Sequence, residues 1–275
     1  MARKLFCELG PTAYKISVWK GIFLRHLSDM FKGEKYASKK TDDEFGNIVK
    51  SHSSLILRRL EGVDMVLQEN KAVNLKLASG KINGIVIRPG ETFSFWKTVG
   101  HPNEKDGYKE GLTVSSRKGL GKGVGGGLCQ CANMIHWLVL HSPLTVSELH
   151  HHSDALFPDE KRRVPFGTGT SIFYNRLDYR FRNDTKQNFQ ILLWTEDGYL
   201  CGELRSEKPI DKKYKIVEED HHFKKEGNDY YRNSRIYRMI TDKNDGSSAK
   251  ELILENHSKV LYDHSLIPSE QIKND

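Results

Sequence analysis

Residues 123–141 read GVGGGLCQCANMIHWLVLH, a glycine-rich turn that leads into an apolar segment. The apolar run predicts a helix over residues 128–141, which Pro143 brings to an end. Cys129 lies at the start of this helix, where unpaired N–H groups carry partial positive charge. We therefore expect the Cys129 thiol to lose its proton more readily than a free cysteine.

The next segment, residues 144–153 (LTVSELHHHS), is predicted to be a strand. Side chains of a strand alternate between its two faces, so Glu148, His150 and His152 would share one face. In one interpretation, His152 or His150 is the general base for Cys129. In a second, the two histidines bind a divalent metal together with Glu148 or Cys129. In a third, the cysteine is simply buried and the histidines lie on the surface without a function.

Residues around the cysteine and on a later strand are candidates for oxyanion or substrate binding. The amides of residues 125–127 would form an oxyanion hole with those of Leu128 and Cys129, or these glycines would serve close packing only. Further polar side chains follow residues 167–170 (GTGT). The candidates are Gly126, Gly127, Leu128, Gln130, Ser153, Thr170, Tyr174 and Arg180.

Composition narrows the class of protein. The 275 residues are 37% hydrophobic, enough for one large core or two small ones, and the net charge of +7 is spread along the chain. No arginine-rich arm or aromatic–basic motif of a nucleic-acid-binding module is present. Four scattered cysteines predict reduced thiols rather than a disulfide framework. We expect a cytoplasmic protein, because no signal peptide is recognisable and residues 13–31 carry too many charges to span a bilayer.

The order of helical and strand patterns predicts an α+β fold. N-terminal helices and the helix that begins at Cys129 would pack on a mostly antiparallel sheet, with a β appendage at the C-terminus. Residues 17–31 form an amphipathic helix, for which docking onto the core is favoured over binding to a membrane surface. The predicted regions are an N-terminal helical region (1–72), a central domain (73–206) and a C-terminal β-rich extension (207–275).

Periodicity predicts the remaining elements. A second helix is expected over residues 48–60, and an irregular loop over residues 100–127. Strands are expected at 73–78, 85–87, 171–182, 188–195 and 199–205, and residues 88–95 are expected to be a turn followed by a short aromatic strand. In the extension, strands are expected at 214–223, 230–241 and 251–262, with turns at 226–229 and 244–247.

Four motifs together resemble the VanW domain. They are residues 88–95 (RPGETFSF), residues 107–108 (GY), residues 125–130 (GGGLCQ) and residues 148–153 in the pattern ExHxHS. The resemblance covers residues 85–205, so the central domain 73–206 is identified as a VanW domain. The overall length is similar to that of stand-alone members, of the kind found in VanB-type vancomycin-resistance clusters.

The resemblance implies a role in cell-wall chemistry. Larger, exported members of the family that are similar in this domain act as L,D-transpeptidases, which join peptidoglycan stem peptides through a cysteine thioester. Their cysteine falls on Cys129, and their glutamate and two histidines fall on Glu148, His150 and His152. Many exported members carry an Arg-Asp pair where this chain has residues 167–169 (GTG), so a carboxylate that orients the base is missing.

The resulting expectation is a protein linked to vancomycin resistance that carries out cysteine-dependent acyl transfer, as an L,D-transpeptidase-like enzyme or an amidase. Its partner would be a peptide or peptidoglycan precursor, with no cofactor, no resident metal and no nucleic acid. One alternative is a non-catalytic accessory protein that binds a precursor or a resistance-pathway partner. The other is a His-x-His metal-binding protein.

Overall fold

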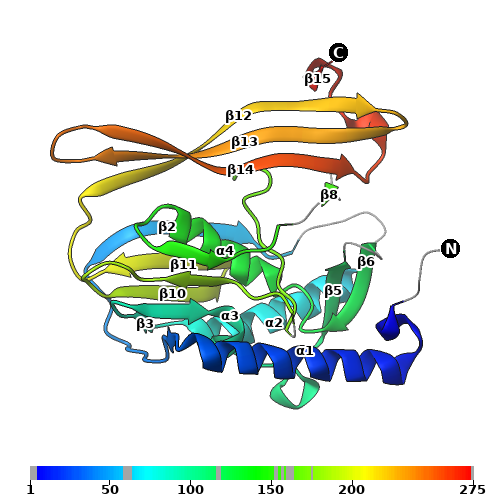
Figure 1. Cartoon of the computed structure of the whole chain (residues 1–275), viewed down its shortest axis with the longest axis horizontal. Coiled ribbons are helices and arrows are strands. Elements are labelled where there is room, and N and C mark those ends of the chain that lie inside the picture. Colours follow the sequence, from blue (N-terminus) through cyan, green and yellow to red (C-terminus); the bar gives the residue numbers. More distant parts are fainter. Residues whose placement is uncertain are drawn as a thin grey trace.

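The computed structural model describes residues 5–57, 64–115, 119–151, 154–155, 158, 164–174 and 176–273. The main body combines helices with two four-stranded sheets and a two-stranded hairpin. The C-terminal strands form a separate five-stranded sheet, which lies along the side of the body opposite the first helix (Figure 1). This arrangement confirms the predicted α+β fold.

An antiparallel sheet forms one wall of the core. Its order is β2-β11-β10-β3, and every neighbouring pair is antiparallel. Its centre is the β10–β11 hairpin, which matches the two strands expected there. The strands are β2 (Asn47–Leu55), β3 (Ile85–Ile87), β10 (Phe189–Glu196) and β11 (Tyr199–Ser206).

The second sheet carries two of the predicted site residues. Its order is β1-β4-β9-β7, with β1 parallel to β4 and the other pairs antiparallel. In the β7–β9 pair, Glu148 lies opposite Arg180. Its strands are β1 (Lys35–Tyr36), β4 (Glu91–Ser94), β7 (Thr145–Glu148) and β9 (Arg180–Arg182), and the separate hairpin is β5 (Glu110–Ser115) with β6 (Gly119–Val124).

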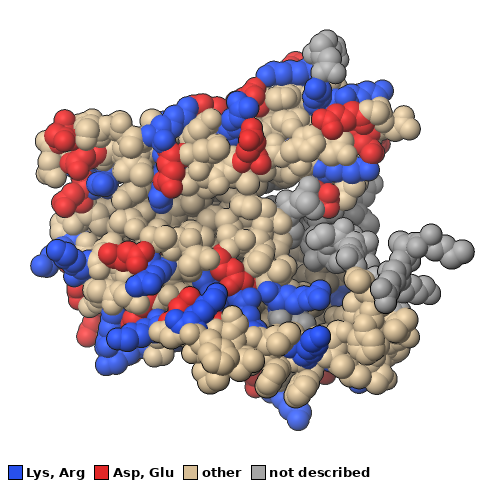
Figure 2. Space-filling model, in the orientation of Figure 1, with Lys and Arg blue, Asp and Glu red and all other residues tan. Residues whose placement is uncertain are grey.

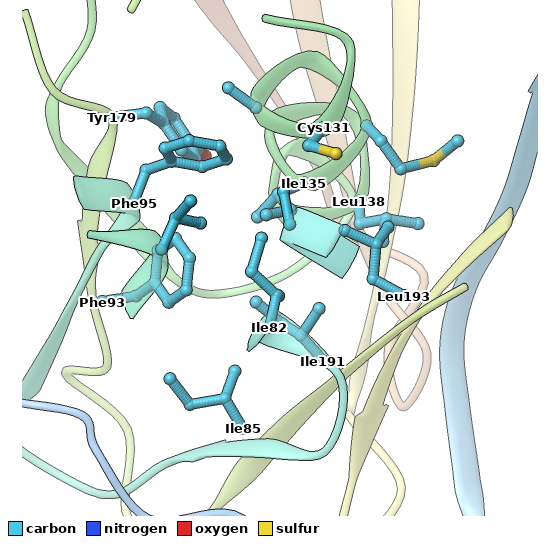
Figure 3. Packing of buried hydrophobic residues seen from close by; sticks show 14 of the residues in the cluster. Ile82, Ile85, Phe93, Phe95, Cys131, Ile135, Leu138, Tyr179, Ile191 and Leu193 are labelled. Atoms are coloured by element: carbon cyan, nitrogen blue, oxygen red, sulfur yellow. The ribbon is translucent and has the colours of Figure 1, made fainter. Parts of the chain in front are cut away.

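Helices α2 (Met65–Ile82) and α4 (Cys129–Leu140) supply the helical side of the core. Ile135 and Leu138 of α4 are fully buried, in one cluster with Ile82 of α2 and Leu193 of β10 (Figure 3). Burying one such side chain stabilises the fold by about 1.5–3 kcal/mol. The other helical segments are α1 (Pro11–Lys32), α3 (Phe95–Val99) and the 3₁₀ turns η1 (Phe6–Glu8), η2 (Glu104–Asp106), η3 (His264–Leu266) and η4 (Ser269–Gln271).

The C-terminal strands form the predicted β appendage. The sheet order is β15-β12-β13-β14-β8, and the two tight turns fall where the Gly227 and Gly246 signals place them. A small apolar cluster lies beside this sheet, and β8 pairs in parallel with the end of β14. The strands are β8 (Asp154–Ala155), β12 (Lys212–Glu226), β13 (Asp229–Asp242), β14 (Ser248–Val260) and β15 (Ile272–Lys273).

Two predicted elements have the opposite structure. Residues 48–60 were expected to be helical, but up to Leu55 they form β2, because β11 offers a pairing partner along the whole strand. Residues 73–78 were expected to be a strand, but they lie inside α2. There, Leu75, Ala78 and Ile82 are buried at helical spacing, and this packing outweighs the local alternation of polar and apolar residues. Helix α2 therefore crosses the expected boundary at residue 72.

Three other segments differ from expectation. Residues 100–127 were predicted to be irregular but contain the β5–β6 hairpin, whose glycines weaken the strand signal. Residues 171–182 are a regular strand only over β9, since Phe173 and Leu177 exchange backbone hydrogen bonds around a turn. The strand expected over residues 144–153 ends at Glu148.

Helix α1 forms as predicted, but none of its residues belongs to the main apolar core among the described residues. Asp29 is its only buried residue, and Val18 and Ile22, on the same side of the helix, are half-buried. The expected apolar docking face is therefore only partly covered, and charged groups also hold this helix to the body. No helix in the described part of the chain is long and apolar enough to cross a membrane.

Candidate functional site

The glycine-rich turn that precedes α4 is fixed by close backbone packing. Gly125 and Gly127 have φ angles of 77° and 91°, a left-handed conformation that favours glycine. A Cβ atom on Gly126 would lie 2.1 Å from the carbonyl carbon of Gly111 in β5. The Gly126 amide donates a hydrogen bond of 3.0 Å to the carbonyl of Gly123. Gly126 therefore shapes the turn, and its amide is already used.

Two amides at the start of α4 have no backbone partner. Within the described residues, the N–H groups of Gly127 and Leu128 donate no backbone hydrogen bond, whereas the Cys129 amide lies against its own sulfur. The first amides of a helix lack an intrahelical acceptor and present partial positive charge. The amides of Gly127 and Leu128 are thus the groups at this turn that could bind an oxyanion.

The thiol of Cys129 is not an activated thiolate in this structure. Burial raises its pKa, and the neighbouring backbone amides of Ile172 and of Cys129 itself offset only part of that rise. No described histidine is hydrogen-bonded to the sulfur. The expectation of a lowered pKa is therefore wrong here, because loss of solvent outweighs the field of the helix N-terminus, which is typically worth about 0.3–1 kcal/mol.

Glu148 and His150 lie together, although β7 ends at Glu148 and His150 is outside the strand. Nε2 of His150 is 2.9 Å from Oε1 of Glu148. The same carboxylate accepts a hydrogen bond of 3.0 Å from the amide of Asp178 and another from the guanidinium of Arg25. Burial by itself would raise the pKa of Glu148, but the hydrogen bonds outweigh it and the pKa is lowered. Glu148 is therefore an ionised carboxylate that orients the His150 ring.

Arg180, predicted to bind substrate, is buried in an ion network. Its guanidinium donates to the two carboxylate oxygens of Asp29 at 2.6 and 3.1 Å, and to Asp178 at 2.7 Å. Burial would raise the pKa of Asp29, but hydrogen bonds from Arg180 and Lys97 outweigh it and hold the pKa well below its usual range. Nε of Arg180 is also 3.4 Å from Glu148. The network thus links α1, β9 and the carboxylate beside His150.

Residues 170–172 connect His150 to the cysteine helix. The Ser171 amide donates to the carbonyl of His150 at 2.6 Å, and the Thr170 amide donates to Oδ1 of Asn133 at 2.7 Å. Asn133 was not among the predicted residues. Its spacing of four from Cys129 is the signal that places both side chains on one face of α4. Thr170 therefore holds the backbone that passes beside the thiol.

Two other predicted residues contact the body of the protein. Nε2 of Gln130 donates to Oγ of Ser54 in β2 at 2.8 Å, which ties the first turn of α4 to the sheet. The ring of Tyr174 lies edge-on to His101, with 4.5 Å between the ring centroids. In this structure both side chains are held by neighbours within the chain.

The remaining predicted residues, His152 and Ser153, lie outside the described residues. The described residues contain no group of three His, Cys, Asp or Glu side chains placed to hold a metal ion. The carboxylate of Glu148 is already bonded to Arg25, His150 and the Asp178 amide, which makes it a poor further ligand. The His-x-His metal site depends on His152 and remains a prediction.

Comparisons with known proteins identify the family. The family model described as "VanW like protein" matches residues 70–205. The chain is 36% identical over 202 residues to the vancomycin B-type resistance protein VanW of Enterococcus faecalis, covering 73% of each chain. It is 27% identical over 149 residues to the uncharacterised protein YoaR of Bacillus subtilis, covering 54% of this chain and 47% of that one. No solved structure matches it. The chain belongs to the VanW family.

Proposed function

We propose that this chain is a cysteine-dependent acyltransferase or amidase that acts on a cell-wall peptide in glycopeptide resistance. The observation that supports this most is the position of Cys129 at the first turn of α4, beside the amides of Gly127 and Leu128, which donate no backbone hydrogen bond. The nearby pair of Glu148 and His150 supports it further, because it supplies an oriented imidazole. The relative named for vancomycin B-type resistance suggests the biological setting.

The proposed reaction has two steps. Sγ of Cys129 attacks a peptide carbonyl carbon, the C–N bond breaks, and the thiol proton passes through an imidazole to the leaving amine. A second amine or water then attacks the thioester, and Cys129 recovers its proton. The amides of Gly127 and Leu128 stabilise the oxyanion, an effect typically worth about 100- to 1,000-fold in rate. The imidazole belongs to His150 or to His152.

Burial raises the pKa of the Cys129 thiol, which favours its protonated form. In the proposed reaction an imidazole therefore takes the thiol proton as the sulfur attacks the peptide. The same observation favours a second candidate function. A protein that only binds a cell-wall peptide, or a partner in resistance, needs no thiolate.

Intact-protein mass spectrometry with a synthetic peptidoglycan stem peptide separates the two candidates. We expect an adduct whose mass equals the peptide less its leaving amine, and no such adduct on the Cys129→Ala variant. Cys201→Ala is the matched control, because Cys201 is a half-buried free thiol on β11. His150→Ala should slow adduct formation by about 100-fold or more if His150 is the base.

The binding interpretation gives a different result. The peptide would bind wild type and Cys129→Ala with equal affinity, and no adduct would form at any time point. That result would replace the acyltransferase with an accessory protein. An adduct that persists on Cys129→Ala would place the nucleophile elsewhere and also contradict the proposal.

A further inference from the structure

Helix α1 exposes a continuous apolar face. Trp19 is 69% exposed and Phe31 is 78% exposed, although both would be buried in a typical core helix. Trp19 stacks on Phe23 with 5.9 Å between their ring centroids. Other large apolar side chains exposed on α1 and the preceding turn η1 are Phe6, Leu9, Tyr14, Ile16, Leu24 and Met30.

The side of α1 that carries Asp29 faces the body and is held by polar bonds. Asp29 bonds to Arg180 and Lys97, and Arg25 bonds to Glu148 and to the carbonyl of Arg176. At 100° per residue, Trp19, Phe23 and Met30 lie on a stripe turned about 80–120° from Asp29, with Ile16 and Phe31 further round. The apolar stripe therefore lies to one side of the contact with the body, and its side chains stay exposed in the described chain.

The charges on this helix are of one sign. Lys15, Lys20 and Lys32 are exposed, while the sole acidic residue between 11 and 32 is the buried Asp29. In Figure 2 the strip along α1 is mainly tan, with blue side chains beside it. A second copy of α1 would bring lysines against lysines, because the sole acidic residue of this helix is the buried Asp29. An anionic partner fits this surface better than self-association.

We propose that α1 and η1 form a docking surface for an anionic lipid bilayer. An amphipathic helix with Trp and Phe on one face and lysines at its border lies in the plane of the membrane interface, with the apolar face among the lipid chains. The 22 residues of α1 give a docking element about 33 Å long. Each lysine near an anionic surface adds to the attraction.

Docking on this surface has a consequence for the candidate site. Arg25, on the body side of the same helix, contacts the carboxylate of Glu148 beside His150. A bilayer bound to the apolar stripe would therefore contact the same helix that holds this pair. The membrane surface does not depend on the proposed acyl transfer, since it is argued from exposure and charge alone.

Vesicle co-sedimentation of the full chain tests the surface. We expect binding to vesicles of equimolar phosphatidylglycerol and phosphatidylcholine at low salt, and far weaker binding to phosphatidylcholine alone or at high salt. Trp19→Ser combined with Phe23→Ser should abolish binding, and Lys15→Glu combined with Lys20→Glu should weaken it about tenfold or more. The matched control is Leu252→Ser with Leu266→Ser, two exposed leucines outside α1, which should bind as wild type does.

Fluorescence quenching by brominated lipids gives an independent reading that does not need a disruptive variant. Wild-type emission should be quenched on anionic vesicles, and the conservative Trp19→Phe variant should lose that quenching while it still sediments. Equal sedimentation of wild type, Trp19→Ser/Phe23→Ser and the leucine control would overturn the proposal. A wild-type dimer that the Trp19 and Phe23 changes convert to a monomer, without vesicle binding, would also overturn it and assign the face to a second copy.

Discussion

Helices α1 and α4 both carry apolar residues at helical spacing, yet the fold uses them in opposite ways. Helix α4 buries Ile135, Leu138 and Val139 in the main core, whereas α1 buries only Asp29. One helix is held by the removal of apolar surface from water, and the other by carboxylate–guanidinium bonds. Periodicity thus predicts that a helix forms, but the neighbouring elements decide which of its faces is buried.

The largest expected effect is a core truncation in α4. Leu138→Ala should lower the free energy of unfolding by about 2–5 kcal/mol, because Leu138 is 0% exposed and a cavity would remain. The matched change in α1 is Leu24→Ala, because Leu24 is 49% exposed. The free energy of unfolding of this variant should stay within about 0.5 kcal/mol of the wild-type value. Urea denaturation followed by circular dichroism measures both. Equal losses would mean that α1 is packed like α4.

A smaller effect is expected where α1 is attached. Asp29→Ala removes the partner of Arg180, but Asp178 and Glu148 still face that guanidinium, so the cost should be about 1–3 kcal/mol. The loss should be local to α1. Hydrogen exchange should show α1 amides losing protection while those of α4 keep theirs, and a uniform loss across both helices would contradict ionic attachment.

The sequence predicts best those elements whose structure is set locally. The two C-terminal turns carry Gly227 and Gly246 at positive φ, and the strands beside them follow from alternation. The secondary structure of β2 and α2 was predicted wrongly because the sequence windows used were short and mixed in pattern. Pairing with β11 makes β2 a strand, and packing of Leu75 against the core makes α2 a helix; the local pattern shows neither.

The candidate site shows the same division. The place of Cys129 follows from the helix start, whereas Glu148 and His150 meet even though the strand expected to carry both ends at Glu148. The role of Asp29, 151 residues from Arg180, could not be predicted because only the fold brings the two together. The shift in the pKa of Cys129 was predicted in the wrong direction. Burial of the sulfur raises this pKa, and that burial depends on how the chain packs over the sulfur, which the sequence does not show.

The smallest predicted effect is a difference in the pH at which His136 of α4 and Asp29 of α1 stop stabilising the fold. Burial of His136 in α4 lowers its pKa to about 3, helped by the nearby His151. The unfolded chain then takes up the proton first, so the stability due to neutral His136 is complete above about pH 6.5 and is lost as the pH falls below it. The pKa of Asp29 is lowered from 3.8, so its contribution is lost only at more acidic pH. The unfolding free energy of the wild type should fall between about pH 7 and pH 5.5. In His136→Gln this fall should be about 1 kcal/mol smaller, whereas in Asp29→Asn it should equal that of the wild type. Urea titrations at both pH values measure this difference, and an identical loss in wild type and His136→Gln would show that His136 is not held neutral by the core.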